Sequence, residues 1–143
     1  TKMVSIAVTS LHFAGLLLGG GAAVAADRET LWAAKEVEPA RRDHLQFLGA
    51  VHAIAITGLA MLAGSGILML LADLETFWAS KAFWTKMALI VLLLANGLMM
   101  RRAERLAATV PDRAWAQLQW TSVVSLVLWF AIVLASTILA ATA

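Results

Sequence analysis

The sequence predicts an all-α integral membrane protein in which four transmembrane helices form an antiparallel bundle. Of its 143 residues, 62% are hydrophobic and only 14% are charged, well below the roughly 25% that is usual in soluble domains. The apolar residues are gathered into four long runs, at about 4–26, 45–72, 82–100 and 116–140. Each run reaches the roughly 20 residues that a helix needs to cross the hydrocarbon core.

Composition also excludes several classes of function. The runs lack the alternation of barrel strands, and an open sheet in lipid would leave backbone groups unpaired. The chain has no cysteine, which excludes disulfides, iron–sulfur clusters and thiolate metal sites. Its net charge of +2 is small and dispersed, so no nucleic acid partner is expected. No nucleotide-binding or hydrolase motif is found. We expect one domain over residues 1–143, with the lipid bilayer as its main partner.

The first run holds the best candidate for a functional residue. His12 lies in the middle of apolar sequence, and an ionisable group inside a membrane is by default a candidate for ligand binding or proton handling. Gly15 and Gly19 follow on the same helical face. Such a pair allows close approach of either a neighbouring helix or a flat ligand, and both alternatives stay open.

The same run also resembles a secretory signal peptide. Lys2 precedes the apolar stretch, and Ala23-Val24-Ala25 has the small residues of a cleavage site. We expect a retained transmembrane helix instead.

The second run contains a histidine and a methionine that cannot both face one site. His52 and Met61 are nine residues apart, which places them on opposite sides of a helix. His52 therefore faces a different neighbour or lies near the headgroups, and it is a candidate for a second metal site. His44 is expected to be solvated at the membrane edge. A stripe of small and weakly polar residues suits the bundle interior: Thr57, Gly58, Met61, Gly64 and Ser65.

The third and fourth runs add a cation and an aromatic ring. Lys86 lies about a turn inside its run, where it either takes part in a site or extends to the membrane surface. Trp129 shares a face with Ser122, Ser125 and Ser136, and it either packs in the core or holds a flat group.

Depths estimated from the helical rise suggest two groups of polar residues. His12, Met61 and Lys86 or Met87 fall in the outer half of the membrane. His52, Asn96 and Gln119 fall in the inner half. His12 and His52 differ in depth by more than roughly 10 Å, so they do not suit one haem iron. Every Asp and Glu is expected in a loop or at a helix end, which disfavours a proton-coupled transporter.

The positive charges predict an orientation. Eight lysines and arginines lie in the segments after the first and third runs: Arg28, Lys35, Arg41, Arg42, Arg101, Arg102, Arg105 and Arg113. The positive-inside rule places these segments in the cytoplasm and both termini outside, in the periplasm if the membrane is a bacterial inner membrane. Trp78 and Trp84 fit an interfacial aromatic belt at the outer side.

Three stretches carry a resemblance to known proteins. Leu11-His12-Phe13-Ala14-Gly15 is similar to the first helix of bacterial four-helix proteins related to HemJ-type protoporphyrinogen oxidases and CopD-like copper-resistance domains. Phe83-Trp84-Thr85-Lys86-Met87 resembles their third helix. The run Ser125-Leu126-Val127-Leu128-Trp129 is similar to uncharacterised members.

The resemblance implies a function. HemJ-like proteins are associated with haem b and use a first-helix histidine and a third-helix lysine, which correspond here to His12 and Lys86. The expected protein is then a haem-binding redox protein acting with a quinone or porphyrin substrate. Its site would comprise His12, Gly15, Gly19, Met61, Lys86 and Trp129.

Two alternatives remain open. Histidine and thioether ligands suit Cu(I), so His12 and Met61 fit a CopD-like copper permease, although the six methionines form no cluster. The chain also fits a non-catalytic subunit of a larger complex or a homo-oligomer.

Overall fold

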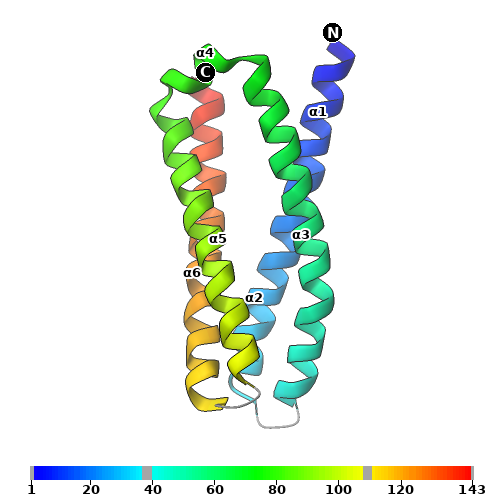
Figure 1. The fold of residues 1–143 in the computed structure, drawn as a ribbon, viewed down its shortest axis with the longest axis vertical. Helices are drawn as coiled ribbons and strands as arrows, with labels where there is room; N and C mark the ends of the chain where they lie inside the picture. The colour runs from blue at the N-terminus through cyan, green and yellow to red at the C-terminus, as the bar shows by residue number, and fades with distance from the viewer. Residues whose placement is uncertain (1, 37–39, 108–110, 143) are drawn as a thin grey trace.

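The computed structural model describes residues 2–36, 40–107 and 111–142, and it confirms the predicted fold class. The described residues are almost entirely helical and contain no strand. Four helices are long and apolar enough to cross a membrane, spanning Lys2–Ala33, Arg41–Ala72, Lys81–Ala107 and Asp112–Ala141. They run antiparallel, with both ends of the chain at the same end of the bundle (Figure 1). We call this the terminal end, and the opposite one the arginine-rich end.

The first membrane-spanning helix consists of three consecutive segments. These are α1 (Lys2–Gly15), a π-helical turn η1 (Leu16–Gly20) and α2 (Gly21–Ala33). A π turn inserts extra backbone into the helix and changes which residues face a neighbour. The helix therefore runs without a break past Ala26, where the apolar run ends, and reaches Ala33. The first membrane helix was expected to end near residue 26, and the structure continues it to Ala33.

The other helices are also longer than their apolar runs. They are α3 (Ala40–Ala72), α5 (Lys81–Ala107) and α6 (Pro111–Thr142), with a short helix α4 (Leu74–Ala79) between α3 and α5. Ser80 caps α5, because its hydroxyl accepts a hydrogen bond from the Phe83 backbone N–H at 3.3 Å. A 32-residue span is about 48 Å long, so the charged ends extend beyond a hydrocarbon core of about 30 Å.

The helices pack as two pairs that α2 joins. α1 lies against α3 and α5 lies against α6, while α2 contacts both α3 and α6. The two pairs are close together at the arginine-rich end and diverge toward the terminal end (Figure 1). Leu93, Trp129 and Ile132 form a buried cluster midway, against which residues from all four spans pack.

The outer surface is apolar. Exposed leucine, isoleucine, valine and phenylalanine side chains cover every long helix, as contact with lipid requires. Near the terminal end, the rings of Trp78 and Trp84 meet edge to face at 5.1 Å, and the Trp84 indole N–H donates to the Trp78 carbonyl. Their position fits the expected interfacial belt.

Candidate functional site

His12 is held by a hydroxyl of the neighbouring helix. Its Nδ1 lies 2.9 Å from Oγ of Ser65 on α3, and Ser65 is fully buried. The Ser65 hydroxyl lies 2.6 Å from the Met61 carbonyl and 3.2 Å from the Leu62 carbonyl. A hydroxyl has one proton to donate, and here a backbone carbonyl takes it. In the hydrogen bond between His12 and Ser65, the imidazole N–H must therefore be the donor and the hydroxyl oxygen the acceptor.

This assignment determines the tautomer of His12. A neutral ring that carries its proton on Nδ1 presents an unprotonated Nε2 with a free lone pair. Histidines that bind metals characteristically donate the other ring N–H to a fixed acceptor, which orients the ring and raises its basicity. Ser65 supplies such an acceptor. His12 could therefore serve as a nitrogen ligand through Nε2.

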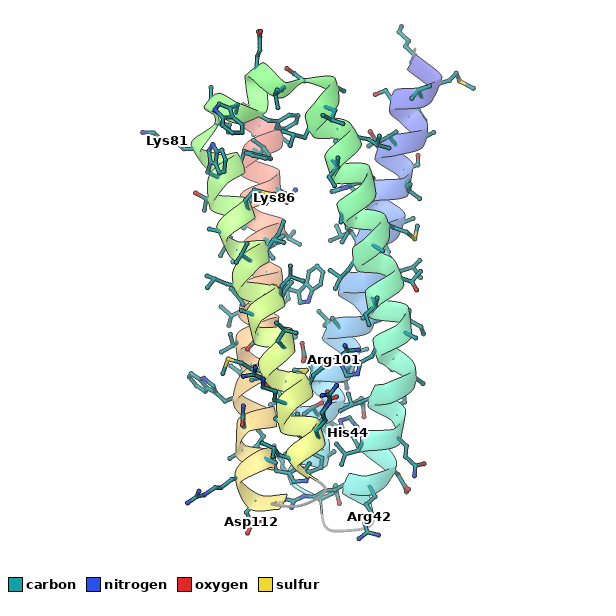
Figure 2. All side chains as sticks on the ribbon, in the orientation of Figure 1. Arg42, His44, Lys81, Lys86, Arg101 and Asp112 are labelled. Carbon is teal, nitrogen blue, oxygen red and sulfur yellow. The ribbon has the colours of Figure 1, made fainter. Side chains whose placement is uncertain are left out.

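Lys86 approaches the same region from the opposite helix pair. It lies on α5 in the half of the bundle near the terminal end, where the pairs diverge (Figure 2). Its side chain is half-buried and lies within electrostatic reach of His12. Met61 is four residues before Ser65 and so shares the α3 face that contacts α1. The structure therefore brings His12, Met61 and Lys86 to one region.

The first-helix glycines serve helix packing. A Cβ on Gly15 would lie 2.8 Å from the Leu62 nitrogen and 2.9 Å from the Gly58 carbonyl oxygen. A Cβ on Gly19 would lie 3.1 Å from the Gly58 carbonyl carbon. The backbones of the two helices touch at this crossing, which is the packing alternative. The prediction that Gly15 and Gly19 line a cofactor site is therefore corrected, because α3 occupies their face.

Trp129 packs in the core rather than facing the His12 region. It is 6% exposed, and its ring lies 3.2 Å from the position of a Cβ on Gly20. The π turn leaves both Gly19 and Gly20 buried, the first against α3 and the second against α6. The indole ring thus packs against the first membrane helix at Gly20, so the predicted role of Trp129 as a surface for a flat cofactor is corrected to packing.

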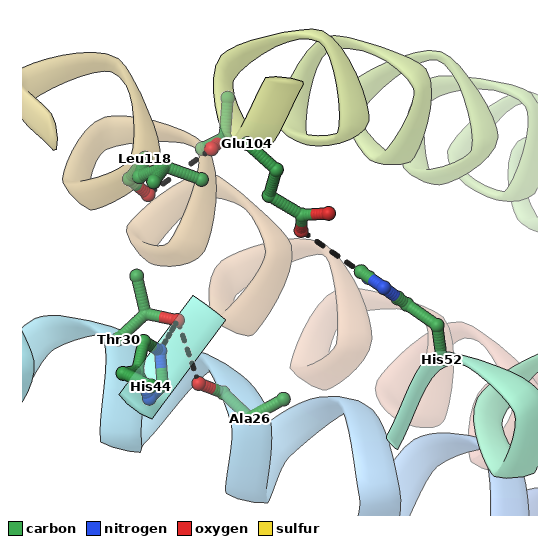
Figure 3. Close-up of polar contacts among 7 residues, drawn as sticks. Ala26, Thr30, His44, His52, Glu104 and Leu118 are labelled. Carbon is green, nitrogen blue, oxygen red and sulfur yellow. Dashed lines mark hydrogen bonds and ion pairs between the residues drawn. The ribbon is translucent and has the colours of Figure 1, made fainter. Parts of the chain in front are cut away.

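His44 is buried, against the expectation of a solvated histidine. It is 8% exposed, and its Nε2 lies 2.9 Å from the Thr30 hydroxyl (Figure 3). The Thr30 hydroxyl donates to the Ala26 carbonyl at 2.8 Å, so His44 is the donor in the contact between them. Its ring also lies against Trp115 and Phe47. His44 is buried because α2 and α3 both extend beyond their apolar runs and pack against each other there.

His52 faces a carboxyl group on α5. Its Nε2 lies 3.4 Å from Oε1 of Glu104, with 23% and 19% of the two side chains exposed (Figure 3). Arg101 lies within electrostatic reach of both. Asn96 instead donates to the Thr121 carbonyl of α6 at 2.8 Å. The predicted inner group of His52 with Asn96 is therefore not formed, and His52 instead faces Glu104, which was expected in a loop or at a helix end.

Asp27 is a second carboxyl group inside the bundle. It is 2% exposed and faces Ser122 and Ser125 on α6. The expectation that all acids lie in loops or at helix ends was therefore wrong for Asp27, whereas Glu104 does lie near the end of α5, with its side chain partly buried. A signal was available, because Asp27 follows Gly20 and Ala23 and precedes Thr30 at helical spacing. Continuing the buried face past the apolar run would have found it.

Within the described ranges, no three side chains from His, Asp and Glu gather as a metal-binding group. A site with His12 as its nitrogen ligand would thus take further ligands from methionine or from a bound group. A scan against protein-family models and searches of curated proteins and of solved structures gave no match to the chain.

Proposed function

We propose that the protein is a haem b-binding membrane redox protein with His12 as an axial ligand. The observation that carries the proposal is the hydrogen bond from His12 Nδ1 to Ser65, which leaves Nε2 free to bind iron. Haem b inside a membrane helix bundle is typically held by such a histidine nitrogen, and its chemistry when bound is one-electron transfer.

Lys86 supports the proposal through its charge. Haem propionates are anionic, and a half-buried ammonium group from the opposite helix pair is a matching partner. The same cation would hold an anionic porphyrin substrate. Lys86 is the residue we assign to substrate or propionate binding, with a quinone as the other candidate redox partner.

The second ligand that we propose beside the His12 nitrogen is a methionine thioether. Met61 shares the α3 face of Ser65, and Met87 directly follows Lys86 along α5. A His/Met pair is an established ligand set for haem iron and raises its potential. His52 is engaged with Glu104 at a different depth, so we do not include it in this site.

The location we propose is a bacterial inner membrane with both termini in the periplasm. Arg42, His44 and Asp112 lie at the end opposite the termini, and Lys81 lies near the terminal end (Figure 2). The segments at the arginine-rich end carry eight lysines and arginines, and such segments stay in the cytoplasm. The candidate haem site would then lie in the periplasmic half.

The test is an absorption spectrum of the purified full-length protein in detergent, oxidised and reduced. The proposal expects a Soret band and reduced α band that His12→Ala abolishes and His52→Ala retains. Ser65→Ala removes the acceptor for the Nδ1 proton and is expected to weaken haem binding about 10- to 100-fold. Thr57→Val is its matched control, because Thr57 also donates to its own helix, at 2.8 Å, but is exposed.

The other outcomes contradict the proposal in distinct ways. Bound copper without haem, lost in both His12→Ala and Met61→Ala, would support the CopD-like copper permease instead. A protein that binds neither haem nor copper and co-purifies with a larger assembly would support the role of an accessory subunit. A haem spectrum that survives His12→Ala would show that the ligand is wrong.

A further inference from the structure

The contact between α2 and α6 contains polar atoms that lack partners. Asp27 is 2% exposed, Ser122 is 0% exposed and Ser125 is 6% exposed. The two hydroxyls face the carboxyl group. Even so, Oδ2 of Asp27 and Oγ of Ser122 complete no hydrogen bond. Ser122 is near enough to act on the carboxyl group but is not in hydrogen-bonding geometry.

Unpaired buried polar atoms are rare, and they mark either strain or a bound species. A buried carboxylate is especially demanding, because a charge taken out of water needs a partner of opposite sign or must be neutralised. The two serine hydroxyls supply dipoles and no charge. The site as it stands therefore has one negative charge too many.

Among the residues that the structure describes, the charged groups of α2 and of the helices in contact with it do not supply the missing cation. On α2 itself, Arg28 is exposed and stacks over Trp32 at 5.6 Å, away from the core. On α3, Arg41 donates to the Ala34 carbonyl at 2.9 Å and lies over the Trp115 ring. His44 is bound to Thr30, and His52 faces Glu104. The charged residues of α6 lie in its first turn: Asp112 and Arg113. They are more than two turns before Ser122.

We infer that Asp27, Ser122 and Ser125 form a binding site for a small monovalent cation, either a proton or an alkali-metal ion. The ligand atoms available to a cation here are all oxygens, which hard cations prefer. Such a cation neutralises the carboxylate and gives the unpaired Oδ2 and Ser122 Oγ a shared partner. Because the donors come from α2 and α6, the cation would also bridge the two helix pairs.

The experiment is thermal unfolding of the full-length protein in detergent, with or without any cofactor it carries. Chloride salts of sodium, lithium, potassium and choline are compared at one ionic strength, and pH is varied in choline chloride alone. The variants are Asp27→Asn, which keeps the shape of the side chain, and Ser122→Ala with Ser125→Ala. Glu104→Gln is the matched control, because it removes a partly buried carboxyl group at a different contact.

An alkali-metal site predicts that one of these ions raises the unfolding midpoint of the wild type and of Glu104→Gln, and not of Asp27→Asn. The serine double variant should then need about tenfold more of the ion for the same shift. A proton site predicts no ion effect and a wild type that loses stability as pH rises, since the folded state would bind the extra proton. Asp27→Asn would lose this slope and Glu104→Gln would keep it. If Asp27→Asn changes neither the ion response nor the pH response, the site does not exist.

Discussion

Gly58 lies where α3 crosses the helix that carries His12, and its backbone is in close contact with that helix. Gly58→Ala tests whether this crossing is essential for the stability of the bundle. A Cβ at this position would lie 2.9 Å from the Gly15 carbonyl oxygen, and still closer to the backbone of Gly19. Ordinary contact begins near 3.4 Å, so α1 must move by at least 0.5 Å at Gly15 and by more at Gly19. Every obstructing atom is backbone, so no side chain can rotate away.

The expected result is a loss of about 1–3 kcal/mol in the free energy of unfolding, as for other overpacked contacts. The separation of the helices also lengthens the His12–Ser65 contact, so any haem affinity should fall with it. Unfolding in mixed micelles, followed by circular dichroism, measures the first effect. Gly64→Ala is the control on the same helix, because nothing lies within 4 Å of its Cβ position. It should be neutral or stabilising by up to about 1 kcal/mol. Equal stability of the two variants would refute the backbone crossing.

Two further predictions concern polar contacts in the arginine-rich half. Asn96→Ala removes the bond to the Thr121 carbonyl and should lower the free energy of unfolding by about 0.6–2 kcal/mol, measured in the same micelle assay. Thr30→Val keeps the shape of the side chain but leaves the donating nitrogen of His44 without an acceptor. It should destabilise by about 1–3 kcal/mol, and a Thr30→Ser variant that restores the hydroxyl should recover most of that loss.

The sequence was sufficient for the four spans and insufficient for their ends. Lipid solvates only apolar side chains, so the runs near residues 4–26 and 116–140 had to be helices within the membrane. Charged residues end an apolar run without ending a helix. α2 continues for two turns past Ala26, and α5 continues past Met100 to Ala107. Because the loops were assumed to begin there, the burial of Asp27 and Glu104 was missed.

For the candidate site, too, the sequence pattern predicted which residues are candidates, whereas their roles depend on how the helices pack. The position of His12 in apolar sequence predicted a ligand candidate, and helical spacing gave the shared face of Gly15 and Gly19. Neither pattern could tell a ligand groove from a helix crossing, since both need small residues. The choice depends on Gly58, which lies on another helix and meets the first-helix glycines only in the folded bundle.

Two of the histidines acquire opposite tautomers by one physical mechanism. Serine and threonine in membrane helices donate their proton to a carbonyl of their own helix, as Ser65 and Thr30 do. The hydroxyl oxygen then remains only as an acceptor, and any histidine that contacts it must donate. His12 donates from Nδ1 and His44 from Nε2, so a free lone pair remains on opposite sides of the two rings. The same side-chain chemistry therefore fixes the tautomer of both rings, and burial makes the difference between them: His44 is buried among the aromatic rings of Phe47 and Trp115, whereas His12 is only partly buried.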